Sequence, residues 1–158
     1  MSAAQWVQMT MALTGEYEAS PVKWVRDQVA AYESSGGTWA NTLRDTGLPV
    51  VIVTSVGVKS GRLRKTPLMR VEYEGRYALV ASQGGAPKHP TWYHNLLRSP
   101  RIELQDGPVP QEMSVRLLEG DEKAEWWERA VQAFPNYAEY QERTERQIPV
   151  FLAEPVSP

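Results

Sequence analysis

Residues 49–83 read PVVIVTSVGVKSGRLRKTPLMRVEYEGRYALVASQ, and this stretch decides the fold. Its first part, Pro49–Val56, is rich in β-branched residues, which favour strands. A turn follows at Gly57–Gly61, where the glycine spacing is typical of a tight connection. Two more strands are predicted over Arg64–Tyr73 and Arg76–Gln83, joined at Glu74-Gly75 by a hairpin in which glycine supplies a positive φ. The stretch therefore predicts three strands of an antiparallel sheet.

The rest of the chain alternates helices with further strands. Arg101–Gln105 and Val109–Leu118 alternate apolar and polar residues around an Asp-Gly-Pro turn, and Ile148–Ala153 is a final strand. Apolar residues at helical spacing predict helices over residues 21–33, 90–98, 121–134 and 137–146. This is an α+β pattern, an antiparallel sheet of about six strands with flanking helices. Because a strand returns after two helices, we expect the sheet to form a split β-barrel.

Two of these helices carry starting signals. Ser20 is expected as the N-cap of the first helix, with Pro21 in its first turn. Asn136, followed three residues later by Glu139, resembles a capping box for the last helix.

Length and charge exclude several classes of protein. A chain of 158 residues is the usual size of one domain, which we place at residues 21–158 after a mobile N-terminal extension of residues 1–20. The net charge of −2 argues against a nucleic-acid partner, and the absence of cysteine excludes disulfides and thiolate metal sites. Residues 2–15 are uncharged, so the extension offers peripheral membrane contact at most. Without a secretory signal or a spanning segment, we expect a cytoplasmic protein.

Two segments are candidates for ligand binding. Lys59 to Arg70 holds five basic residues and no acidic one, so with its glycine turn it predicts an anion-binding cradle; the alternative is a solvated hairpin. The loop Ser82–Pro90 contains adjacent glycines that allow a ligand close to the backbone, with Lys88 beside the next helix N-terminus and Trp92 following. The alternative is that this loop only connects two packed elements and binds no ligand. No metal site is predicted, since the chain has only two histidines, and any difficult chemistry is expected from a bound cofactor.

The ordered combination of several short motifs carries a resemblance. These are GVKSGRLRKTPL at 57–68, ASQGG at 81–85, HPTWYHNL at 89–96, FPNYAEY at 134–140, and the ending IPV at 148–150 with Glu154-Pro155. The chain thereby resembles the deazaflavin-dependent nitroreductase family over roughly residues 49–155. The resemblance implies a split β-barrel that binds reduced coenzyme F-420, a deazaflavin with a phosphate and oligoglutamate tail. It also implies hydride transfer to quinones and, in some members, to nitroimidazoles.

Carried over position by position, the resemblance implies roles for single residues. The tail would meet Lys59 and Arg64, and the deazaflavin and phosphate would lie against Thr66, Pro67, Val80, Ala81, Ser82, Gln83, Thr91 and Trp92. The acceptor would face Ser82, Tyr137 and Tyr140, which are the candidate catalytic residues. The sequence also departs from the family pattern. Thr66 stands where an Asn is familiar, Gln83 replaces a Lys, and Met69 and Phe134 stand where the nitroimidazole-reducing member has Tyr. Nitroimidazole reduction is therefore in doubt.

Two other functions fit the same residues. One is an FMN-dependent oxidoreductase on the same barrel, and the other is a non-catalytic protein that binds a deazaflavin or a heme-like ring. The expected partner is a small quinone-like acceptor, and the sequence does not determine the oligomeric state.

Overall fold

The computed structural model describes residues 13–156, and the β-branched run Val50–Val56 forms its strand β1. The first six residues of β1 are buried, because both faces of the sheet are covered. Alternate residues contribute to two separate cores: Val50 and Ile52 pack toward α2, α4 and α5, whereas Val51 and Val53 pack toward α3. Burial on both sides explains why the first four residues of this strand, Val50–Val53, are all apolar.

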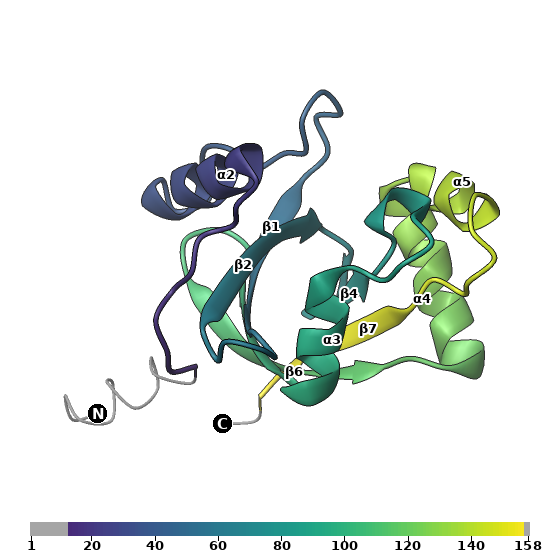
Figure 1. Ribbon diagram of the computed structural model, residues 1–158. Coiled ribbons are helices and arrows are strands. Elements are labelled where there is room, and N and C mark those ends of the chain that lie inside the picture. Colours follow the sequence, from purple (N-terminus) through teal and green to yellow (C-terminus); the bar gives the residue numbers. More distant parts are fainter. Residues whose placement is uncertain (1–12, 157–158) are drawn as a thin grey trace.

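Seven strands form one antiparallel sheet within the described residues (Figure 1). Besides β1 they are β2 (Leu63–Met69), β3 (Glu72–Tyr73), β4 (Arg76–Val80), β5 (Arg101–Gln105), β6 (Pro110–Leu117) and β7 (Val150–Pro155). Their order across the sheet is β2-β1-β5-β6-β7-β4-β3. The predicted α+β split barrel is confirmed.

The single strand expected over Arg64–Tyr73 is in fact two strands, β2 and β3, at opposite edges of the sheet. The Arg70 amide donates to the Pro49 carbonyl (3.0 Å), and the Ala78 amide donates to the Val71 carbonyl (2.9 Å). The link at Arg70-Val71 therefore leaves β1 and joins β4, which draws the two edges together at one end. Toward the other end β2 and β4 separate, and this opening positions the site.

Four helices flank the sheet: α2 (Lys23–Ser34), α3 (Thr91–Arg98), α4 (Gly120–Ala133) and α5 (Asn136–Glu142). Figure 1 shows α2 beside β1 and β2, whereas α4 and α5 lie together on the other side of the molecule, near β4 and β7. A short 3-10 turn, η1 (Gln83–Gly85), connects β4 toward α3 and packs against α5.

Three expectations about the helix ends are wrong. The N-cap of α2 is Val22, and Ser20 instead accepts a hydrogen bond from the Val22 amide through its hydroxyl oxygen (3.1 Å). The capping box at Asn136 does not form, because Pro135 takes the N-cap position and Asn136 is already helical. Helix α5 ends at Glu142, so Arg146 lies in irregular chain that turns back toward the end of β4.

The described part of the N-terminal segment runs along β2. The Leu63 amide donates to the Glu16 carbonyl (2.8 Å), and the Glu18 amide donates to the Leu63 carbonyl (2.9 Å). Most of the uncharged run at residues 2–15 lies outside the described residues. Within residues 13–156 no helix combines the length and the apolar character needed to cross a membrane.

Candidate functional site

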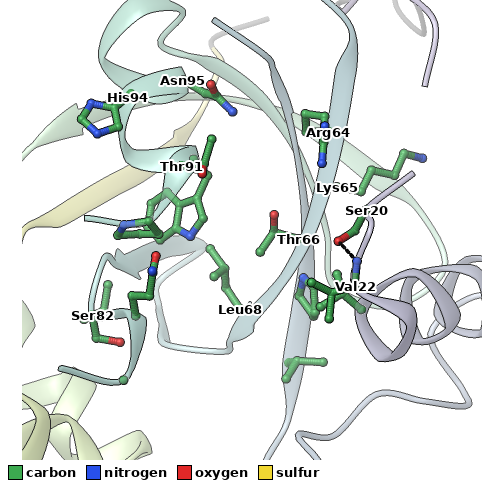
Figure 2. Close-up of a pocket in the computed structure, with 18 of the residues that line it drawn as sticks. Ser20, Val22, Arg64, Lys65, Thr66, Leu68, Ser82, Thr91, His94 and Asn95 are labelled. Carbon is green, nitrogen blue, oxygen red and sulfur yellow. Dashed lines mark hydrogen bonds between the residues drawn. The ribbon is translucent and has the colours of Figure 1, made fainter. Parts of the chain in front are cut away.

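A cleft of about 1390 Å³ opens where β2 and β4 separate. Its walls come from the 18–22 segment, α2, the β1–β2 turn, β2, the end of β4, the start of α3, and α5. In the close-up view, Arg64 and Lys65 lie at one end and Ser82 at the other, with Thr66 and Leu68 between them (Figure 2). The cleft therefore has two ends of different chemistry.

One end, here called the basic mouth, is formed by Lys59, Arg64 and Lys65. Arg64 pairs with Glu18 at 3.1 Å, and Lys65 pairs with Glu33 while its ammonium lies over the Tyr17 ring. Lys59 is exposed and has no ion-pair partner within residues 13–156. The mouth can therefore bind an anion with Lys59 directly and with Arg64 in competition with Glu18.

The glycine turn that carries Lys59 is held in place by two hydrogen bonds. The Gly57 amide donates to the Arg62 carbonyl (2.8 Å), and the Val58 amide donates to the buried Asn95 side-chain oxygen (3.0 Å). A Cβ at Gly57 would come within 3.0 Å of the Ser60 hydroxyl, so the tight turn has no room for a side chain there. Asn95 thus fixes the turn onto α3.

The middle of the cleft is a slot with apolar walls. Thr66, Pro67 and Leu68 come from β2, and Val80 and Trp92 come from β4 and α3. Trp92 is 9% exposed and packs against Phe151, with ring centroids 6.1 Å apart. It is therefore both part of the core and part of the cleft wall. Walls of this kind suit a planar aromatic ring.

Beyond the slot, the chain turns sharply through η1. Gln83, Gly84 and Gly85 have φ values of 44°, 64° and 82°, so three consecutive residues are left-handed. A Cβ at Gly85 would lie 2.7 Å from the Tyr140 carbonyl oxygen, whereas one at Gly84 would meet nothing within 4 Å. The first glycine thus leaves space beside the cleft, and the second allows η1 to contact α5.

An aromatic cluster of Phe134, Tyr137 and Tyr140 lines the cleft beside η1. The Tyr137 ring centroid lies 5.0 Å from that of Phe134 and 6.2 Å from that of Tyr140. Tyr137 is 4% exposed, and burial raises the pKa of its hydroxyl above the ordinary range, so the group stays protonated as a donor. No described residue accepts a hydrogen bond from this hydroxyl.

The structure brings most of the predicted site residues to this one cleft: Lys59, Arg64, Thr66, Pro67, Val80, Ser82, Gln83, Thr91, Trp92, Tyr137 and Tyr140 all line it. Two predicted residues do not line it. Ala81 is fully buried in the core that packs toward α3, on the other face of the strand from Val80, because successive residues of an extended chain face opposite ways. Lys88 is exposed outside the cleft, on a loop anchored at its flanking residues Ala86 and His89.

Sequence reasoning missed Arg146 and Glu18. Arg146 was assigned to a helix, although its guanidinium contacts backbone carbonyls at the end of β4. Glu18 fell in the extension, with no local pattern that relates it to Arg64. Contacts across 64 and 46 positions of chain leave no periodic signal.

Known proteins resemble this chain in sequence and in fold. A family model described as F420H(2)-dependent quinone reductase matches residues 24–155. An F420H(2)-dependent quinone reductase of Mycobacterium tuberculosis is 33% identical over 107 residues, which are 66% of this chain and 72% of the relative.

Solved structures agree with the family model. A structure described as an F420-H2 dependent reductase is 52% identical, with a TM-score of 0.64 over 67% of this chain and 94% of that one. Another, described as a domain-swapped dimer, is 48% identical, with a TM-score of 0.66 over 85% of this chain and all of that one. A heme-binding protein from Mycobacterium smegmatis, 16% identical with a TM-score of 0.53, covers 79% of this chain and 51% of its own and shares the fold alone. The chain therefore belongs to the F420H(2)-dependent quinone reductase family.

Proposed function

We propose that the protein reduces a quinone, or a similar planar electrophile, with a hydride from reduced coenzyme F-420. The observation that carries this proposal is the layout of the cleft. A basic mouth lies at one end, an apolar slot in the middle, and Ser82 at the other end. The Tyr137 hydroxyl belongs to α5, which lines the same cleft and packs against η1 next to Ser82. A ligand with an anionic tail and a planar ring fits the first two parts, and a carbonyl acceptor fits the third.

The donor set supports the binding of this cofactor. Lys59 and Arg64 suit phosphate and carboxylate groups, while Pro67, Val80 and Trp92 suit an aromatic ring. When bound, reduced F-420 supplies the hydride that the chain itself has no group to provide. The residues of the chain bind and orient the two partners so that the hydride donor and the acceptor meet.

The acceptor end has a role in stabilising charge. A quinone that accepts a hydride develops negative charge on its oxygen, and the Tyr137 hydroxyl is a buried donor free of competing protein acceptors within residues 13–156. Ser82, which is 8% exposed, faces the same end of the cleft. Both donors interact more strongly with the developing charge than with the neutral carbonyl, which is the condition for catalysis.

We favour quinones over nitroimidazoles as the acceptor. Met69 and Phe134, the two positions where tyrosine stands in the nitroimidazole-reducing member, line the cleft and are buried. Neither side chain can donate a hydrogen bond to a nitro oxygen. The apolar wall that they form is suited to a quinone ring.

A spectroscopic experiment tests the function directly. Protein, reduced F-420 and menadione are mixed, and the return of the oxidised cofactor absorbance is followed, with a nitroimidazole replacing menadione in a parallel reaction. Rapid oxidation with menadione alone supports the proposal. A yellow protein that is active only with FMN would favour the flavin enzyme, and tight F-420 binding without turnover on any acceptor would favour a binding protein.

We also propose that the chain dimerises, since the 48% identical structure is described as a domain-swapped dimer. Light scattering coupled to size-exclusion chromatography measures the mass against 17.8 kDa for one chain.

A further inference from the structure

Arg146 binds the loop that follows β4 through four contacts. Its Nη1 donates to the Ala81 carbonyl (3.2 Å), its Nη2 to the Ser82 carbonyl (2.8 Å), and its Nε to the Ala86 carbonyl (2.9 Å). Nη1 also lies 3.0 Å from His89 Nδ1, which must accept because a guanidinium only donates. One side chain thus holds both ends of the loop.

These contacts determine where the amide hydrogens of the loop point. In a trans peptide the carbonyl and the following N–H point in opposite directions. Because Arg146 holds the carbonyls of Ala81 and Ser82, the amides of Ser82 and Gln83 point away from it. Ser82 and Gln83 line the cleft and Arg146 does not, so both amides are directed to the cleft side.

The same amides lack protein partners. Within residues 13–156 no carbonyl or side chain accepts a hydrogen bond from the amides of Ser82, Gln83 or Gly84. Ser82 is right-handed (φ −78°, ψ −39°) and Gln83 and Gly84 have positive φ. A right-handed residue followed by left-handed ones directs successive amides into one concavity that binds anions. We call this group of three amides the amide nest.

We propose that Arg146 is a positioning residue that orients the amide nest to bind the oxyanion formed on the acceptor. This inference rests on the proposed quinone reduction. The quinone takes a hydride with its electron pair and becomes a hydroquinone anion, which a proton from solvent completes. The donor is oxidised by two electrons and releases one proton to solvent. The nest holds the negative oxygen between these steps.

Location distinguishes the acceptor from the cofactor tail as the ligand of the nest. Ser82 lies across the cleft from Arg64 and Lys65 (Figure 2), so the nest is at the far end from the basic mouth. Gly85 packs against Tyr140, which brings the nest beside the aromatic cluster. The nest and the Tyr137 hydroxyl therefore serve the same end of the cleft.

Arg146 is itself held in place. The Gln141 side-chain amide donates to the Arg146 carbonyl (2.8 Å), and its oxygen accepts from the Ile148 amide (2.9 Å). Gln83, a non-glycine residue at φ 44°, is strained and needs such external support. A lysine at position 146 keeps the charge, but its three donors share one nitrogen, so it cannot reproduce the planar fork by which Nε, Nη1 and Nη2 reach three separate carbonyls.

The test compares two variants, Arg146→Lys and Arg146→Met, with the control Arg101→Met. The control removes an exposed arginine of β5 that pairs with Glu112. The probes are 2-hydroxy-1,4-naphthoquinone, a stable planar oxyanion at neutral pH, and neutral menadione. Their dissociation constants are measured on protein without cofactor. Both Arg146 variants should bind the anion about tenfold more weakly and menadione within about twofold of the parent, whereas Arg101→Met should match the parent for both probes.

Turnover supplies a second readout. In both Arg146 variants kcat with reduced F-420 and menadione should fall about tenfold or more, while KM for menadione changes less than about threefold. If Arg146→Met does not fold, His89→Phe removes one acceptor and should show the same selective loss at about two- to threefold.

Three outcomes would overturn the proposal. Recovery of anion binding in Arg146→Lys would mean that only the charge matters, and equal losses for both probes would mean that the cleft has collapsed. A parent protein that binds the anion no better than menadione has no working nest. Absence of turnover in the parent would refute the proposed function instead, and the probe measurements would still judge the nest.

Discussion

Glu18 and Arg64 form an ion pair at the basic mouth, with 3.1 Å between Glu18 Oε2 and Arg64 Nη1. Arg64 is the residue that sequence resemblance assigns to the cofactor tail, so in the free protein its charge is already matched by a carboxylate. The 16–18 segment that supplies Glu18 is hydrogen-bonded to Leu63, next to Arg64 itself. An incoming anion must therefore compete with Glu18.

The first prediction concerns this competition. Arg64→Ala should weaken F-420 binding by about 1.5 kcal/mol, the low end for a charged hydrogen bond, since the Arg64 side chain is 32% exposed. Glu18→Gln should strengthen binding by about 0.2–1 kcal/mol, the usual worth of a partly exposed pair. Fluorescence titration measures both constants. Glu16→Gln is the matched control. Equal effects from the Glu16 and Glu18 variants would mean that Glu18 does not compete with the anion for Arg64.

The second prediction concerns the Tyr137 hydroxyl. Tyr137→Phe should lower kcat/KM for menadione by about 10²-fold, because it removes the hydroxyl that we propose stabilises the developing charge. The melting temperature and the F-420 dissociation constant should not change, since the hydroxyl bonds to no described residue. Ser82→Ala should act in the same direction. Tyr73→Phe, on the exposed edge strand β3, is the control. Parent-like turnover in the double variant of Tyr137 and Ser82 would mean that neither hydroxyl is catalytic and that the pocket is only an apolar slot.

The third prediction concerns the two adjacent glycines of η1. Gly84→Ala meets no atom within 4 Å and should cost about 1–2 kcal/mol of unfolding free energy, the cost of a Cβ at positive φ. Gly85→Ala should cost about 1–3 kcal/mol more, because its Cβ would lie 2.7 Å from the Tyr140 carbonyl. Urea denaturation of the two variants isolates the contact with α5. Equal losses would mean that η1 moves freely.

The fourth prediction concerns His89 and pH. Burial, aided by the charges of Arg146 and His94, lowers the pKa of His89 below its ordinary value near 6.5. Between the folded and unfolded pKa values the unfolded chain binds more protons, so stability is complete above about pH 6.5 and is lost as the pH falls through the folded value. His89→Phe keeps a ring on Tyr93 and should remove this part of the slope in melting temperature from about pH 7.5 to 5. His94→Asn should retain most of the slope, and an unchanged slope in His89→Phe would contradict the assignment.

Local pattern predicted the parts of the fold that depend on neighbouring residues. The hairpin at Glu74-Gly75 is confirmed, with φ values of 53° and 77°, because a two-residue turn between twisted strands requires positive φ. Strand β1 is confirmed, because a run of β-branched apolar residues favours a buried strand without reference to the rest of the chain. The division of the predicted 64–73 strand was missed, because no residue at Arg70-Val71 breaks the pattern where the chain changes partner.

The sequence by itself determined the family, the split barrel and most of the cleft lining, because strand and turn propensities and the ordered motifs are local properties of the chain. Only the tertiary structure decided how that lining is held. It placed Ala81 in the opposite core and Lys88 outside the cleft, paired Arg64 with Glu18, and ended α5 early enough for Arg146 to reach the carbonyls of Ala81 and Ser82. These contacts join residues far apart in the chain, so they depend on how the strands and helices pack together, as α5 does against η1.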